Sequence, residues 1–185
     1  RIDSDGDHRR ATLLATGALM AGGAALGLPA LAQGNEPIRI GHLTPLTGFL
    51  GALGDYAQQG IKMAAEEVNA AGGVNGRKIE LISEDSVNPQ TASSKAQRMI
   101  ERDKVQVLMG EINSASALTA RNKTLFMSIG ARSDALRGKD CNRYTFHVDI
   151  PVTVMVNAAG EALLREGLVK GKKIYALTSD YLFGH

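Results

Sequence analysis

The sequence predicts an α/β fold built around a parallel β-sheet, and two observations carry that prediction. Beyond residue 32, short apolar runs alternate with segments in which apolar residues recur every three or four positions. This alternation of strands and helices is typical of βαβ units, whose strands pair in parallel. The composition, with 44% hydrophobic and 22% charged residues, is that of an ordinary globular protein.

The first βαβ unit begins with a strand predicted at residues 38–43. A glycine-rich loop, residues 44–54, leads to a helix that two adjacent glycines end. The apolar face of this helix has spacings of three and four, and consists of Ala57, Ile61, Ala64, Ala65, Val68 and Ala71. An Asn75-Gly76 turn then precedes a second strand at residues 78–84, where polar and apolar residues alternate.

Local chemistry marks the start of the next helix. Asn88 is suited to cap the free N–H groups, and Pro89 suits the first helical position. The apolar stripe of this helix is predicted to be Ala92, Ala96, Met99 and Ile100. The remaining predicted elements are strands at 105–109, 124–129, 144–148 and 174–178, a short helical stretch after the third strand, and a helix that Pro151 opens.

The N-terminal residues 1–32 are interpreted as a secretory signal peptide. His8, Arg9 and Arg10 precede an uncharged run at 11–28 and a small-residue site that ends at Ala32, after which we expect cleavage. A membrane anchor is the alternative, because the run approaches the ~18 residues of a spanning helix, but its glycines dilute the apolarity. The paired arginines leave both the twin-arginine and the general secretion routes open.

Charge and motif content exclude several function classes. The net charge is +2, and it stays +2 without residues 1–32, so nothing indicates a nucleic-acid partner. The four histidines are scattered, and no spacing suited to a metal, a phosphate or a dinucleotide is present. The single cysteine, Cys141, cannot form an internal disulfide, and is interpreted as a bystander. The adjacent acids Glu66-Glu67 and Glu84-Asp85 are interpreted as solvated faces.

A ligand site is predicted where the order of the strands reverses. In open parallel sheets, ligands bind at the carboxyl ends of the strands, where neighbouring loops diverge. If the order is 2-1-3-4, the reversal lies between the first and third strands, beside the loops at 44–54 and 113–116. Ser114 and Ser116 stand at a helix start that suits a carboxylate. They also suit simple helix capping, and only their position at the reversal favours binding.

Four stretches in order resemble the periplasmic solute-binding proteins of branched-chain amino-acid type ABC importers, which are type I two-lobed binding proteins. The stretches are residues 40–48, 66–77, 84–89 and 179–184. The resemblance implies a three-layer, Rossmann-like parallel-sheet lobe at residues 33–149. It also implies that residues 150–185 hold the crossover and the start of a second lobe, which is mostly missing from the sequence.

The resemblance also implies a set of ligand-binding residues. In the loop after the third strand, the hydroxyl that holds the ligand carboxylate corresponds to Ser114. Relatives that hold aliphatic amino acids often have Thr where this chain has Arg132, so we expect an additional acidic group on the ligand, unless Arg132 points to solvent. The full set implied is Ser114, Ala115, Ser116, Gly130, Ala131, Arg132 and Ser133, with Leu53 and Phe183 at positions where relatives place an aromatic wall.

The sequence therefore leads us to expect the substrate-binding component of an ABC transporter, located in the periplasm. It would capture an amino acid or a related small amide or carboxylate and deliver it to an inner-membrane permease. No cofactor, metal, nucleic acid, enzymatic activity or lasting membrane anchor is expected. The alternative is an exported sensor of the same fold that regulates a partner protein. With one lobe incomplete, we expect this chain to bind ligand poorly.

Overall fold

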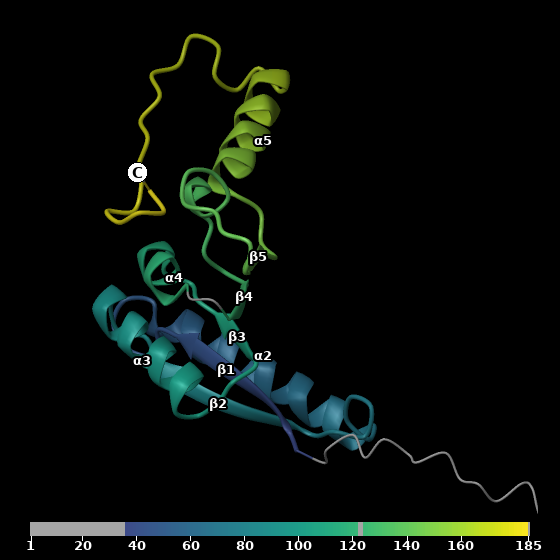
Figure 1. Cartoon of the computed structure of the whole chain (residues 1–185). Helices are drawn as coiled ribbons and strands as arrows, with labels where there is room; N and C mark the ends of the chain where they lie inside the picture. Colours follow the sequence, from purple (N-terminus) through teal and green to yellow (C-terminus); the bar gives the residue numbers. More distant parts are fainter. Residues whose placement is uncertain (1–35, 122–123, 185) are drawn as a thin grey trace, which may run out of the picture. The chain divides into compact units, whose positions relative to one another are not determined.

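The structure is a computed structural model that describes residues 36–121 and 124–184 (Figure 1). The predicted signal peptide, with its cleavage site after Ala32, lies outside the described residues, as do His8 and His185. The sequence-based interpretation of those residues therefore stays a prediction.

One five-stranded parallel sheet organises the described residues. Its strands are β1 (Ile38–Thr44), β2 (Ile79–Asp85), β3 (Val107–Gly110), β4 (Leu125–Ser128) and β5 (Thr145–His147). Their order is β2-β1-β3-β4-β5, which agrees with the 2-1-3-4 order that the predicted ligand site assumed and places β5 at the edge. The α/β fold class is thereby confirmed.

The register aligns the carboxyl ends of all five strands. Leu43 of β1 lies opposite Glu84 of β2 and Gly110 of β3, Gly110 lies opposite Ser128 of β4, and Ser128 lies opposite His147 of β5. The loops that follow the strands therefore leave the sheet from a single row. Between β1 and β3, the connections run in opposite directions and the loops diverge.

Helices cover the two faces of the sheet. They are α2 (Gly51–Ala70), α3 (Pro89–Glu101) and α4 (Ser114–Ala120). Two further elements are a 3-10 turn η1 at Asp134–Leu136 and the helix α5 (Val152–Arg165), which follows β5 in the chain. Successive residues of a strand point to opposite faces. In β1, Gly41 faces Met99 of α3, whereas His42 lies within the electrostatic reach of Lys62 on α2. The layers are thus α2, the sheet, and then α3 with α4.

The helix α3 forms as its sequence predicts. Asn88 caps it, because its side chain accepts a hydrogen bond from the backbone N–H of Thr91 at 2.9 Å, and Pro89 is the first helical residue. Ala92, Ala96 and Met99 are buried, and Ile100 packs at the edge of the same core.

That core lies between the sheet and the helices α3 and α4. Its largest fully buried apolar side chains are Leu43, Met99, Leu108 and Phe126. Burying a side chain of this size contributes about 1.5–3 kcal/mol. These four side chains pack α3 against the central strands of the sheet. The packing stabilises the strand ends from which the loops begin.

The glycine-rich segment before α2 differs from the prediction. Residues 44–54 were expected to form a loop, but α2 begins at Gly51. A Cβ on Gly54 would stand only 1.7 Å from the carbonyl oxygen of Pro45. The glycine is therefore required for close packing of the helix on the preceding loop, rather than for an open loop. On the inner face, Ala57, Ile61, Ala65 and Val68 are partly buried, whereas Ala64 and Ala71 are exposed.

The strand predicted at residues 174–178 was wrong, because these residues form no strand. Ile174, Tyr175 and Leu177 are 72–100% exposed, and no described strand pairs with them. An extended segment needs a neighbouring strand to satisfy its backbone groups, and apolar alternation alone does not supply one. The α5 helix is present as predicted, but none of its residues is fully buried.

One titratable side chain is buried within the α2 side of the sheet. His42 is fully buried, and its Nε2 atom has no hydrogen-bond partner among the described residues. Burial, assisted by the charge of Lys62, lowers the pKa of His42 from 6.5 to about 4. The folded protein therefore favours neutral His42.

We predict that His42 causes acid sensitivity. Because the pKa of His42 is lower in the folded than in the unfolded state, its contribution to stability is present above pH 6.5 and is lost as the pH falls towards about 4. Replacing it in the variant His42→Gln should remove about 3 kcal/mol of this pH dependence. Urea unfolding at several pH values measures the effect. An unchanged slope between pH 7 and pH 4 in the variant would contradict it.

Candidate functional site

A cavity of about 460 Å³ lies at the carboxyl ends of the strands. Its lining comes from the start of α2, from the loops after β3, β4 and β5, and from the C-terminal segment. The lining residues are Leu50, Leu53, Ala57, Ile112, Ile129, Gly130, Arg132, Asp149, Tyr181 and Phe183. The cavity thus adjoins the reversal between β1 and β3, and its size suits a small organic ligand.

Four of the residues predicted from the sequence line this cavity. They are Leu53, Gly130, Arg132 and Phe183. The other five, Ser114, Ala115, Ser116, Ala131 and Ser133, do not line it. Four of these five are buried, and Ala115 is partly buried. The start of α2 and the loop after β4 therefore contribute predicted residues to the cavity, whereas residues 113–116 contribute none.

The helix α4 is capped by Asn113, which the sequence reasoning did not single out. Its Oδ1 atom accepts hydrogen bonds from the backbone N–H groups of Ala115 at 2.9 Å and Ser116 at 3.1 Å. The Ser114 hydroxyl accepts the backbone N–H of Ser133 at 3.2 Å. The alternative in which Ser114 and Ser116 cap this helix is therefore excluded, because Asn113 is the cap. Because Asn is among the strongest capping residues, its place before the two serines was a usable signal.

Arg132 lies in the cavity lining rather than in free solvent. Its Nε atom donates to Oδ2 of Asp149 at 2.5 Å, and its Nη1 atom lies 3.6 Å from the sulfur of Met155. The ion pair is half-buried, with the side chains 38% and 21% exposed. Asp149 was missed from the sequence, because nothing local indicates that the loop after β5 meets the loop after β4.

Two aromatic rings form part of the cavity wall. Tyr181 and Phe183 have ring centroids 5.9 Å apart, and Tyr181 also meets Phe49 edge-on at 5.6 Å. Burial raises the pKa of Tyr181, although the nearby charge of Arg132 acts in the opposite direction. The hydroxyl of Tyr181 is therefore neutral at physiological pH. Tyr181 was not among the predicted site residues.

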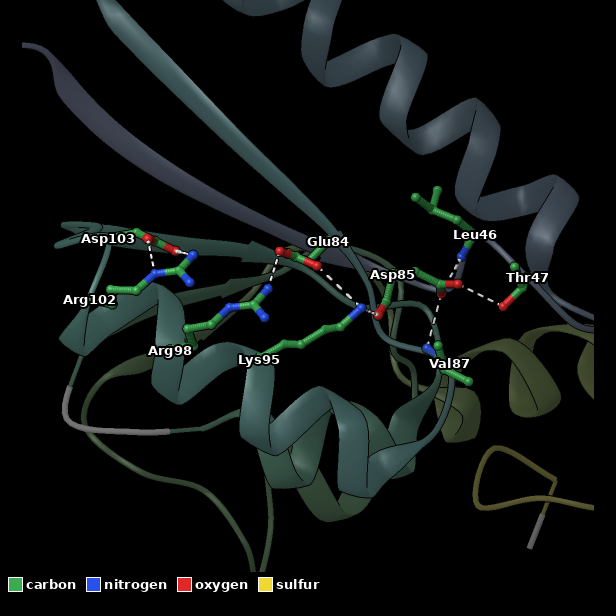
Figure 2. A network of polar contacts seen from close by, with 9 residues as sticks. All are labelled: Leu46, Thr47, Glu84, Asp85, Val87, Lys95, Arg98, Arg102 and Asp103. Carbon is green, nitrogen blue, oxygen red and sulfur yellow. Dashed lines mark hydrogen bonds and ion pairs between the residues drawn. The ribbon is translucent and has the colours of Figure 1, made fainter.

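A polar network holds the loop after β1 in place (Figure 2). Asp85 accepts hydrogen bonds from the backbone N–H of Leu46 at 2.8 Å, the hydroxyl of Thr47 at 2.7 Å and the backbone N–H of Val87 at 3.0 Å. Burial alone would raise the pKa of Asp85, but these hydrogen bonds outweigh it and lower the pKa. The network thereby positions the loop that leads to Leu50.

The same network reaches the helix α3. Lys95 donates to the carbonyl oxygen of Asp85 at 2.7 Å and pairs with Glu84 at 3.2 Å, and Arg98 also pairs with Glu84 (Figure 2). The interpretation of Glu84-Asp85 as a solvated face was therefore wrong, since both side chains are partly buried and bonded. Their side chains do serve different partners, as expected for adjacent residues of a strand. Glu66 and Glu67 are exposed.

Glu111, directly after β3, is a buried carboxylic acid. It is fully buried, and its Oε1 atom accepts a hydrogen bond from the hydroxyl of Ser86 at 3.0 Å, while Oε2 has no partner among the described residues. Burial raises the pKa of Glu111 from 4.5 to about 7, and the hydrogen bonds only moderate this rise. The preceding Gly110 has φ 128°, and a Cβ there would stand 2.1 Å from the carbonyl oxygen of Leu43.

We predict that Glu111 limits stability at alkaline pH. Because the pKa of Glu111 is higher in the folded than in the unfolded state, its contribution is fully present below pH 4.5 and is lost as the pH rises through about 7. The variant Glu111→Gln imitates the protonated acid, so it should be about 3 kcal/mol more stable than the original chain at pH 8 and similar at pH 4.5.

Thermal and urea unfolding at the two pH values check this prediction. The matched control is Glu101→Gln, because Glu101 is an exposed glutamate at the end of α3. Equal effects of the two substitutions at pH 8 would show that burial of Glu111 is not the cause.

Two kinds of feature are absent from the residues that the structure describes. In these parts of the chain, no three His, Cys, Asp or Glu side chains form a group suited to a metal ion. Within residues 36–121 and 124–184, no helix has the length and apolarity needed to cross a membrane. Cys141 is exposed.

Comparisons with known proteins agree with the fold. A family model described as "Periplasmic binding protein" matches residues 37–185. A Leu/Ile/Val-binding protein homolog from Brucella suis is 29% identical over 154 residues, which are 80% of this chain and 38% of that protein. Another homolog, from Brucella abortus, is 39% identical over 100 residues, or 52% of this chain and 25% of that protein.

Solved structures of substrate-binding proteins are also similar. A periplasmic binding protein from Burkholderia mallei has 32% identity and a TM-score of 0.71, and the match covers 82% of this chain and 41% of that one. A solute-binding protein of an ABC transporter from Rhodopseudomonas palustris, in complex with 3,4-dihydroxybenzoic acid, has 25% identity and a TM-score of 0.72 over 82% and 41% of the two chains.

The branched-chain amino acid transporter substrate-binding protein of Streptococcus pneumoniae, in complex with isoleucine, has 27% identity and a TM-score of 0.58 over 62% of this chain and 34% of that one. The chain spans between a quarter and about two fifths of the length of the proteins that it matches. With the parallel sheet, the strand order and the family match along residues 37–185, the chain belongs to the periplasmic binding protein family, in the type I branch that serves branched-chain amino-acid type ABC importers.

Proposed function

We propose that this chain is the ligand-binding part of an ABC transporter substrate-binding protein. It captures a small carboxylate, either an amino acid or a related organic acid, for delivery to an inner-membrane permease. The observation that carries the proposal is the cavity at the strand-order reversal, which combines apolar walls with a single ion pair. Such a lining suits a ligand with an apolar body and a carboxylate group.

The proposal extends to the organisation and location of the chain. Residues 1–32 act as a signal peptide, residues 33–149 form a ligand-binding lobe, and residues 150–185 form the crossover and the start of a second lobe. The periplasm is the compartment that fits the family. The protein binds its ligand without converting it, as family membership favours.

Two kinds of ligand have support from similar proteins. One structural relative holds isoleucine, and another holds 3,4-dihydroxybenzoic acid. Both ligands join a carboxylate to an apolar or aromatic body, so both suit walls made of Leu50, Leu53 and Phe183. Capture of a small carboxylate is therefore the function that the geometry and the relatives support together.

We predict that isoleucine or 3,4-dihydroxybenzoate binds in this cavity. In a titration of the ¹⁵N-labelled chain followed by NMR, backbone amide signals of the lining residues should shift, with Leu53, Ile112 and Gly130 as reporters. This measurement detects weak binding as well as tight binding. Amides of Gln97 and Glu101, on the exposed side of α3, should stay unchanged. Shifts confined to other regions, or none with either compound, would contradict the proposed function.

A further inference from the structure

We propose that Arg132 is the residue that recognises the carboxylate of the ligand, and that Asp149 orients it for this purpose. The inference rests on the proposed function and names the chemistry by which the same cavity selects its ligand. It predicts a preference for acids over uncharged molecules of the same shape.

Two backbone N–H donors at the start of α4 are already engaged, and the hydroxyl of Ser114 beside them is buried. Asn113 takes the backbone N–H groups of Ala115 and Ser116, and the hydroxyl of Ser114 is fully buried and bonded to the backbone of Ser133. A carboxylate in the cavity would have to displace these contacts to reach the start of α4. Displacement would leave the side chain of Asn113 without its partners, which costs free energy.

The cavity lining itself offers one cation. Among its ten residues, only Arg132, Asp149 and Tyr181 carry polar side-chain groups, and only Arg132 is positively charged. Asp149 repels an anion, and the Tyr181 hydroxyl is a neutral donor. The remaining walls are apolar. An organic acid therefore finds its strongest partner at the guanidinium group.

The guanidinium group is held in place but keeps donors for a ligand. Its contact with Asp149 uses Nε, which is one of five N–H donors. Among the described residues, the partner of its Nη1 atom is the sulfur of Met155, a weak acceptor. The backbone of Arg132 is fixed as well, because its carbonyl oxygen accepts the N–H of Val152 at 2.9 Å. Arg132 is thus pre-organised, and this reduces the entropy cost of binding.

Arg137 provides a matched control within the same segment. It is an arginine five positions further on, and it donates to Nδ1 of His147 at 2.9 Å and to the carbonyl oxygen of Asp149. Like Arg132, it therefore stabilises the loop after β5 through a contact with Asp149. Arg137 does not line the cavity, so it shares the structural role of Arg132 without the proposed contact with the ligand.

The experiment compares benzoate with benzamide, which has nearly the same shape but no charge. Binding of each probe to the original chain, to Arg132→Gln and to Arg137→Gln is measured by NMR titration, and the thermal unfolding of each variant is recorded. The original chain should prefer benzoate. Arg132→Gln should weaken benzoate binding about 10- to 100-fold, the range of a charged hydrogen bond, and leave benzamide binding unchanged. Arg137→Gln should keep the preference.

The outcomes separate this inference from the proposed function. If benzoate binds in the cavity and Arg132→Gln still prefers benzoate to benzamide, the inference is wrong while the proposed function stands. The same holds if Arg137→Gln abolishes this preference as fully as Arg132→Gln does. If neither isoleucine nor 3,4-dihydroxybenzoate binds in the cavity, the proposed function itself fails. If Arg132→Gln does not fold, the NMR signal of the Arg132 Nε–H group in the original chain is measured instead. This signal should shift with benzoate and not with benzamide, and equal shifts with both probes would contradict the inference.

Discussion

The rest of the structure depends on one constraint, the parallel pairing of strands with a reversal of their order between β1 and β3. Parallel pairing in register places the ends of all strands in a single row, from Glu84 at one edge to His147 at the other. At the reversal, the following loops turn to opposite faces of the sheet and leave a crevice. The cavity adjoins this reversal. Its place is therefore a consequence of topology, and only its lining is a matter of local sequence.

Local contacts convert the crevice into a defined site. Asp85 gathers three donors from two loops, and Gly54 lets α2 approach the loop after β1 closely. Asn113 and Arg132 then have different roles. Asn113 satisfies the backbone N–H groups at the start of α4, whereas Arg132 brings the one positive charge into a lining that is mostly apolar. A half-buried guanidinium group without a counter-ion would be costly, and Asp149 offsets that cost.

Much of the fold could be predicted from the sequence, because short-range patterns control it. The Asn88-Pro89 start of α3, the five strands and the order around the reversal all follow from capping chemistry, periodicity and topology rules. The site was only partly predictable. Leu53 and Arg132 line the cavity as expected, but Asp149 reaches Arg132 through tertiary contact alone. The strand predicted at 174–178 was wrong for a related reason. A strand needs a neighbouring strand to pair with, and periodicity does not reveal whether one is present.

The most direct test of the account is a crystal structure of the chain grown with 4-bromobenzoate and recorded at the bromine absorption edge. Anomalous scattering locates the bromine without assumptions about the rest of the ligand. The account predicts the bromine among Leu50, Leu53 and Phe183, with the carboxylate at the guanidinium group of Arg132. A bromine site outside the cavity, or a carboxylate bound at the start of α4 with Arg132 uninvolved, would contradict it.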